Sequence, residues 1–180
     1  MYIVGAANSA GQAALNMSQF ARRIVLLVRS GSLETGMSRY LVERIEAAEN
    51  IEVRLDTEVV AATGDGHLES LTLSHRPTGT KDDVVTNWLF VFIGASPRTD
   101  WLGDEVARDD KGFVITGTDL MTWDGAPYWS LSRSPFVLET SVPGVFAAGD
   151  VRYDSMKRVA SAVGEGAMSV YFVHRYLETV

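Results

Sequence analysis

The sequence predicts an α/β fold in which a mostly parallel sheet is interrupted by an antiparallel β excursion. Three observations predict it. A short apolar strand, a turn and a helix follow one another twice within residues 1–55, as in a parallel α/β sheet. Gly64-Asp65-Gly66 then separates two strand-like runs, and these residue types tolerate the positive φ of hairpin turns. A long apolar run over residues 84–93 finally predicts a return to the sheet.

The first βα unit begins at the N-terminus. Residues 1–4 form an apolar run that leads straight into Gly5, which is typical of a buried strand ending in a tight turn. Small and apolar residues recur at helical spacing over residues 9–22, and residues 24–28 form an apolar run that is too short for a helix. We therefore expect a strand, a turn, a helix and a second strand in this order.

The second unit and the excursion follow directly. Residues 37–48 carry apolar side chains on one helical face, and residues 51–55 alternate as a strand does. Residues 58–63 and 68–75 are the two arms of the expected hairpin. Residues 84–93 are expected to form one long apolar strand that ends at the following glycine.

The composition changes after Gly94, where Gly, Asp, Pro and Trp become more frequent. We expect one domain over residues 1–95 and a second segment over residues 96–180. In the second segment, residues 145–148 are predicted to form a short strand leading to Gly149-Asp150, and residues 156–177 a closing helix.

The composition disfavours several classes of function. The net charge of -7 opposes binding to nucleic acid and to anionic membrane surfaces. The chain has no cysteine, and its three histidines lie far apart without carboxylates at ligand spacing, so no disulfide and no metal site are expected. The longest apolar run, residues 88–95, is too short to span a bilayer, and no signal sequence is visible, which favours a cytoplasmic protein.

A candidate dinucleotide-binding loop follows the first strand. Gly5 would make the tight turn, Ala10 would permit close packing of helix and strand, and the amides at the helix N-terminus could bind phosphate. The position between them that is usually glycine is Ala7, which adds one methyl group where a pyrophosphate approaches. An ordinary strand-to-helix turn with small residues is the alternative.

Arg29 stands at the end of the second strand, where NAD-specific folds carry a carboxylate for the ribose hydroxyls. A guanidinium at this position can instead hold a 2′-phosphate through charge-assisted hydrogen bonds, so the sequence favours NADP(H). The alternative is a solvated cation with no ligand.

Two later segments carry a family resemblance. TSVPGVFAAGDV at residues 140–151 and KRVASAVGEGA at residues 157–167 resemble the FAD-binding end of the thioredoxin reductase class of pyridine nucleotide-disulfide oxidoreductases. VGAANSAGQAA at residues 4–14 and LFVFIGASPRT at residues 89–99 match the nicotinamide-domain loop and the return strand of that class, in the same order. The resemblance implies a Rossmann-like NAD(P)H-binding domain followed by the C-terminal part of an FAD-binding Rossmann-like domain.

The resemblance also assigns roles to individual residues. It places Asn8, Ser9 and Ala10 at the NADPH pyrophosphate, Arg29 at the 2′-phosphate, and Ile93 and Gly94 near the nicotinamide. Asp150, next to Gly149, would hydrogen-bond the ribityl chain of FAD. The segment that begins the last helix would face the flavin N1 and O2 region, where positive charge and a helix N-terminus stabilise a reduced flavin. Its residues are Lys157, Arg158, Val159 and Ala160.

The sequence departs from the family pattern at several positions. Ser30 and Glu34 stand where the family carries further basic residues of the phosphate site, and Val159 replaces a glutamine that contacts the flavin. Family members also open with a flavin-binding GxGxxG half, and thioredoxin reductases add a CxxC pair. Neither is found here, so we expect the chain to be a fragment of a longer enzyme.

The resemblance implies an FAD-dependent NAD(P)H oxidoreductase that passes hydride from NADPH to FAD and on to a disulfide or another acceptor. Its partners would be NADP(H) and a redox-protein acceptor, with a homodimer in the full-length parent. Two alternatives stay open. One is a truncated, non-catalytic module that binds NADP(H) or a partner. The other is an NADP-dependent dehydrogenase without flavin, which leaves the Gly149-Asp150 motif unexplained.

Overall fold

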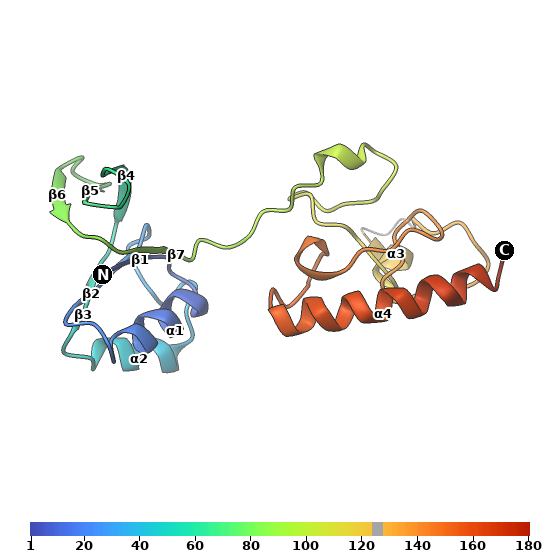
Figure 1. The fold of residues 1–180 in the computed structure, drawn as a ribbon, viewed down its shortest axis with the longest axis horizontal. Helices are drawn as coiled ribbons and strands as arrows, with labels where there is room; N and C mark the ends of the chain where they lie inside the picture. Colours follow the sequence, from blue (N-terminus) through green and yellow to red (C-terminus); the bar gives the residue numbers. More distant parts are fainter. Residues whose placement is uncertain (124–127) are drawn as a thin grey trace. The chain divides into compact units, whose positions relative to one another are not determined.

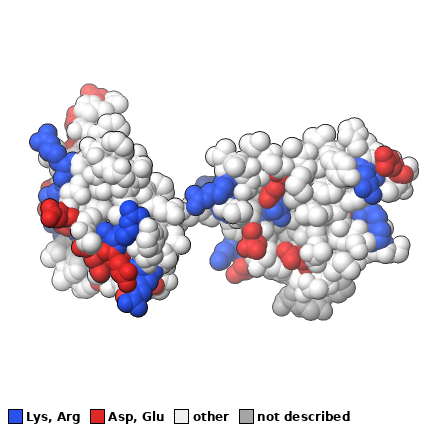
Figure 2. Space-filling view, turned by 90° about the horizontal axis from the view of Figure 1, so that it is seen from below, with Lys and Arg blue, Asp and Glu red and all other residues white. Residues whose placement is uncertain are grey.

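The computed structural model describes residues 1–123 and 128–180, and the chain forms two compact units, Met1–Gly94 and Ala95–Val180 (Figure 1). Acidic and basic side chains are interspersed on the face of each unit shown in Figure 2. None of the helices in the described ranges combines the length and apolar character that a bilayer crossing requires. The predicted fold class is confirmed, because a parallel sheet, an antiparallel sheet and covering helices are all present.

Unit 1 is built on a four-stranded parallel sheet with the order β3-β2-β1-β7. The strands are β1 Tyr2–Val4, β2 Ile24–Leu27, β3 Ile51–Arg54 and β7 Leu89–Val91. Ile3 of β1 pairs with Leu26 on one side and with Phe90 on the other. Strand β1 is therefore an inner strand, and the chain that follows it starts from the middle of the sheet.

Strand β2 is buried on both faces, as its unbroken apolar sequence predicts for an inner parallel strand. Leu26 lies in the core cluster that the sheet forms with the helices. Leu27, which points to the other face, lies in a second cluster with Leu71 and Leu73 from the antiparallel excursion. The sheet is thus covered by helices on one face and by a second sheet on the other.

Helices α1 (Asn8–Met17) and α2 (Arg39–Glu46) contribute to the same core cluster on one face of the parallel sheet. They approach closely because Gly11 of α1 has no side chain, and a Cβ there would lie 2.7 Å from Met37 Sδ and 3.3 Å from Ile45 Cδ1. Helix α1 ends earlier than its sequence pattern predicts.

The excursion is an antiparallel sheet of β4 (Thr57–Thr63), β5 (Ser70–His75) and β6 (Lys81–Val85), with β5 in the middle. The turn between β4 and β5 contains Gly66, which has a φ of +68°. The predicted hairpin and its glycine turn are confirmed.

The expectation of one long strand over residues 84–93 is wrong. Strand β6 belongs to the antiparallel sheet and β7 to the parallel sheet, and the chain changes sheets between them. Buried Thr86 causes the change, because its Oγ1 and the Trp88 amide are 3.3 Å apart and its own amide donates to Glu69 O at 3.0 Å. Continuous apolar character does not reveal such a change of partner.

The turn from β1 into α1 depends on Gly5. Its φ is +150°, and a Cβ there would lie 2.5 Å from Phe92 O and 2.8 Å from the Cβ of Ala10. The Gly5 amide also donates to Leu27 O at 3.1 Å. Only glycine allows the end of β1, the chain after β7 and the start of α1 to meet at this distance.

Unit 2 has little regular structure. The elements in its described part are η1 Asp100–Leu102, α3 Asp119–Thr122, η3 Gly149–Val151 and α4 Val159–Leu177. The strand predicted over residues 145–148 is absent from the described chain, because Phe146 makes only an isolated antiparallel bridge to Glu139 and no ladder extends it. The last helix begins at Val159 rather than at residue 156, since Lys157 has a φ of +52° that a helix cannot accommodate.

A fully buried carboxylate organises the middle of unit 2. Glu139 accepts two hydrogen bonds from the Arg133 guanidinium, at 2.8 and 2.7 Å, and one each from the amides of Phe136 and Gly144, both at 2.9 Å. Burial alone would raise the pKa of Glu139, but the hydrogen bonds from Arg133 and the two amides outweigh it, so the pKa lies below its ordinary value of 4.5.

Gly5→Ala is expected to lower the free energy of unfolding of unit 1 by about 2–3 kcal/mol, because the added methyl forces the backbone apart in a packed region. The loss of stability is measured by urea unfolding, with hydrogen exchange in peptides from β1 and β2 as the readout for unit 1. Gly66→Asn is the control, since Asn tolerates a positive φ and nothing lies within 4 Å of a Cβ at that turn. Equal losses in both variants would contradict the role assigned to Gly5.

Glu139→Gln is expected to destabilise unit 2 at pH 7 by about 2–3 kcal/mol, less than for a fully enclosed pair because Arg133 keeps some access to water. A depressed folded-state pKa gives stability that is complete above the unfolded pKa of about 4.3 and is lost as pH falls. The difference from the parent chain should therefore shrink below about pH 4.3. Urea titrations at pH 7 and pH 3.5, with exposed Asp110→Asn as control, test this, and a constant difference at both pH values would refute it.

Candidate functional site

The candidate nucleotide site of unit 1 is the edge of the parallel sheet where its strands end and α1 begins. Ala7 is the extended N-cap of α1, with φ -102° and ψ 176°, and Asn8 and Ser9 after it are exposed. The first-turn amides of an α-helix have no carbonyl partner within the helix. The positive end of α1 and its exposed first turn therefore form a place where an anion can bind.

Ala10 has a different part from the two residues before it. It is fully buried, and its amide donates to Ala7 O at 3.0 Å. Its Cβ lies close to the Gly5 backbone. The structure thus gives Ala10 the packing role that a small residue at this position permits, and leaves Asn8 and Ser9 as the exposed groups of the loop.

Asn8 joins the helix start to the following loop. Its Oδ1 accepts a hydrogen bond from the Ser38 amide at 2.7 Å, and Ser38 is the N-cap of α2. Gly36 brings the same loop against the first turn, because a Cβ there would lie 3.1 Å from Ala6 O. The sequence pattern predicts Ser38 inside the helix, whereas it is the N-cap of a helix that begins at Arg39, and no sequence pattern reveals its pairing with Asn8.

Arg29 is exposed two residues after the end of β2, at the position for which the sequence predicts the 2′-phosphate contact. The backbone around it is fixed, because the Thr57 amide donates to Val28 O at 3.0 Å and the Asp56 amide to Ser30 O at 3.1 Å. Arg76 Nη1 donates to Arg29 O at 3.3 Å. This second guanidinium, which follows β5, is a residue that the sequence analysis missed.

Ile93 and Gly94 are the last residues of unit 1. Ile93 is 73% exposed, and Gly94 has a φ of +94° with nothing within 4 Å of a Cβ position. The preceding residue is anchored, since the Phe92 amide donates to Val4 O at 2.7 Å. The side chain of Ile93 is therefore exposed, while the backbone just before it is fixed to β1.

In unit 2, the Gly149-Asp150 motif is held by α4. The Gly149 amide donates to Glu165 Oε2 at 2.6 Å, and the Arg152 guanidinium donates to both Glu165 oxygens, at 2.9 and 2.6 Å. Arg152 also donates to Thr116 Oγ1 at 2.9 Å. This network leaves Asp150 exposed on the short helix η3.

Glu165 is charged at neutral pH. The hydrogen bond from Arg152 is the largest influence and lowers the pKa of Glu165, and the Gly149 amide lowers it further, against the opposing effect of burial. The carboxylate is a bidentate partner of Arg152, which gives the pair a fixed geometry. Glu165 therefore positions the Gly149 backbone. This role of Glu165 was not predicted from the sequence.

The segment before α4 carries the remaining predicted flavin residues. Lys157 Nζ donates to Arg152 O at 3.2 Å and lies 4.2 Å from the centre of the Phe113 ring. Arg158 is the N-cap of α4, and Val159 and Ala160 form its exposed first turn. A helix of 19 residues thus begins beside two cations, an electropositive arrangement that suits a negatively charged ligand group.

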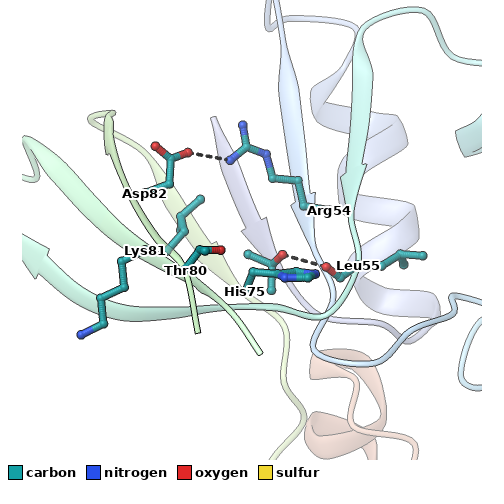
Figure 3. A pocket seen from close by; sticks show the side chains of 8 residues that line it. Arg54, Leu55, His75, Thr80, Lys81 and Asp82 are labelled. Carbon is teal, nitrogen blue, oxygen red and sulfur yellow. Dashed lines mark hydrogen bonds and ion pairs between the residues drawn. The ribbon is translucent and has the colours of Figure 1, made fainter. Parts of the chain in front are cut away.

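A cavity of about 450 Å³ lies where β3 gives way to the antiparallel sheet (Figure 3). Its guanidinium, Arg54, is paired with Glu52 at 2.8 Å and with Asp82 at 3.2 Å. None of the residues predicted for nucleotide or flavin binding lines this cavity. It is therefore separate from the two candidate cofactor regions.

Comparison with known proteins identifies the family of the chain. A family described as pyridine nucleotide-disulphide oxidoreductase matches residues 1–166. The chain is 29% identical to the thioredoxin reductase of Chlamydia trachomatis, over 99% of this chain and 51% of that protein. It is 30% identical to the thioredoxin reductase of Eremothecium gossypii, over 97% of this chain and 49% of that protein.

A solved structure has a similar fold. The crystal structure of thioredoxin reductase from Streptococcus pyogenes aligns with a TM-score of 0.68 at 26% identity, over 99% of this chain and 52% of that one. The chain thus spans about half the length of the relatives that it matches. The resemblance found in the sequence is confirmed, and the chain belongs to the pyridine nucleotide-disulphide oxidoreductase family, with thioredoxin reductases among its relatives.

Proposed function

We propose that unit 1 binds NADP(H) and that unit 2 contacts the flavin of an FAD-dependent NAD(P)H oxidoreductase of the thioredoxin reductase type. The observation that carries the proposal is the Gly5 turn, which sets the exposed first turn of α1 at the carboxyl edge of a parallel sheet. In open α/β folds this edge is where dinucleotides bind. The family membership supports the same reading.

The residues of unit 1 fit a dinucleotide phosphate. The amides at the start of α1 and the exposed side chains of Asn8 and Ser9 would hold the pyrophosphate, and Arg29 would hold the 2′-phosphate. Asn8 uses its oxygen for Ser38, which leaves its Nδ2 as a donor for the ligand. Ile93 and Gly94 would lie on the nicotinamide side.

The residues of unit 2 fit part of a flavin site. The exposed Asp150 carboxylate would accept a hydrogen bond from a ribityl hydroxyl, and Glu165 keeps the neighbouring Gly149 in place. Lys157, Arg158 and the α4 amides at Val159 and Ala160 would stabilise negative charge on the ring. A bound FAD would supply two-electron chemistry between NADPH and a disulfide or another acceptor.

The proposal extends to partners. A redox protein as electron acceptor is supported by the names of the relatives, which are thioredoxin reductases, and a homodimer of the complete enzyme is what the family resemblance implies. This chain spans about half of each relative. We therefore propose the acceptor and the dimer for the complete enzyme, not for the 180-residue chain alone.

The 180-residue chain is expected to bind NADPH more tightly than NADH, and Arg29→Ala should remove about 1.5–3 kcal/mol of that difference, the contribution of a hydrogen bond to a charged group. Isothermal titration calorimetry with both nucleotides measures it. Arg22→Ala, which removes an exposed cation elsewhere in unit 1, should leave the preference unchanged. Equal affinities for the two nucleotides in the unmutated chain would count against the 2′-phosphate assignment.

In the complete enzyme, Asp150→Ala is expected to weaken flavin binding by about 1.5–3 kcal/mol, because a ribityl hydroxyl would lose a charged acceptor. NADPH affinity should barely change, since Arg29 and Asp150 lie in different units and share no hydrogen-bond partner. Quenching of FAD fluorescence and NADPH calorimetry, run on the same preparations, separate the two effects. A variant that kept FAD binding but lost NADPH binding would show that the motifs are assigned to the wrong cofactors.

A further inference from the structure

We infer that Arg76, from the turn after β5, is a second guanidinium of the 2′-phosphate subsite and helps to select NADP(H). The inference rests on the proposed NADP(H) binding of unit 1. Arg76 lies 47 positions after Arg29, in the turn that follows β5, yet its Nη1 donates to the backbone oxygen of Arg29 at 3.3 Å. The two guanidinium-bearing residues therefore meet at the end of β2.

Arg76 is brought there by a series of backbone hydrogen bonds. The Asp56 amide donates to Ser30 O at 3.1 Å, and the Arg76 amide donates to Asp56 O at 2.8 Å. Strand β5, which precedes Arg76, is anchored on the parallel sheet by the fully buried side chain of Leu71. The backbone of Arg76 is thus fixed relative to the residue that follows β2 before any ligand binds.

The chemistry of the side chain suits the role. A guanidinium carries five N–H donors, and the Arg29 oxygen uses one of them. Arg76 is exposed, so the remaining donors are open to a ligand. Arginine forms strong paired hydrogen bonds to phosphate, and binding to a backbone oxygen restricts its otherwise flexible side chain.

The local charges explain why one arginine is insufficient. A 2′-phosphate carries a charge of about -1.5 to -2 at neutral pH. The Asp56 carboxylate is close by, with an oxygen 3.3 Å from the position that a Gly31 Cβ would take, and Glu34 lies in the same loop. Arg29 alone is outnumbered by the carboxylates of Asp56 and Glu34, whereas Arg29 and Arg76 together balance these two negative charges before the phosphate binds.

The position of Arg76 also addresses a departure seen in the sequence. Ser30 stands where the family resemblance places another basic residue, and its hydroxyl donates to Ser32 O at 2.9 Å. The second cation therefore comes from the loop after β5 instead of from the loop after β2.

The test compares 2′,5′-ADP with 5′-AMP, two ligands that differ in the 2′-phosphate, by calorimetry on the 180-residue chain. Arg76→Ala and Arg76→Gln should each weaken 2′,5′-ADP by about ten-fold, the loss expected for a charge-assisted hydrogen bond, and leave 5′-AMP unchanged. Gln keeps an amide donor for the Arg29 oxygen but not the charge. Lys81→Ala removes a nearby exposed cation and should change neither affinity.

The possible results distinguish a failure of the Arg76 assignment from a failure of the proposed NADP(H) site. If both Arg76 variants keep the 2′,5′-ADP affinity while Arg29→Ala loses it, Arg76 has no part in selection and the proposed NADP(H) site stands. If Arg76→Gln binds as the parent does while Arg76→Ala does not, the residue only supports the loop and the inference fails. If the parent chain binds 2′,5′-ADP no better than 5′-AMP, the subsite is absent, and if it binds neither, the proposed function fails with it.

Discussion

Burial of β2 on both faces is the constraint on which unit 1 depends. Leu26 belongs to the core with the helices and Leu27 to the core with the antiparallel sheet. The strand therefore lies in the middle of three layers, between the helices and the antiparallel sheet. Burying two such side chains contributes about 1.5–3 kcal/mol each. This packing holds the end of the strand, and Arg29 with it, in one place. A polar residue at either position would break one of the two cores.

Most of unit 1 could be predicted because its local patterns agree with its tertiary structure. The apolar run of β2, the amphipathic α2 and the glycine turn at Gly66 each carry a short-range signal, and Gly5 is recognisable because it stands between a strand and a helix. The predictions failed where the structure depends on which strand a segment pairs with. Residues 84–93 read as one apolar strand, but Thr86 divides them between two sheets.

The candidate site shows the same division. The exposed position of Arg29 could be predicted because it follows a short apolar strand, and its role in dinucleotide recognition stays a prediction. The hydrogen bond between Asn8 and Ser38 and the contact of Arg76 with Arg29 join residues 30 and 47 positions apart. Glu165 reaches Gly149 across 16 positions. No periodicity or motif encodes such pairs, because they follow from how elements pack.

The pairing of β1 with β7 bears on how this unit folds. Tyr2 lies opposite Leu89, so this pair forms only after the entire intervening chain has been gathered into a closed loop. The entropy lost in closing a loop grows with its length, and contacts distant in sequence slow folding. The pair of β1 with β2 closes a much shorter loop than the pair of β1 with β7. Because Ile93 and Gly94 follow β7, the segment proposed to lie on the nicotinamide side is fixed only when this long-range pair has formed.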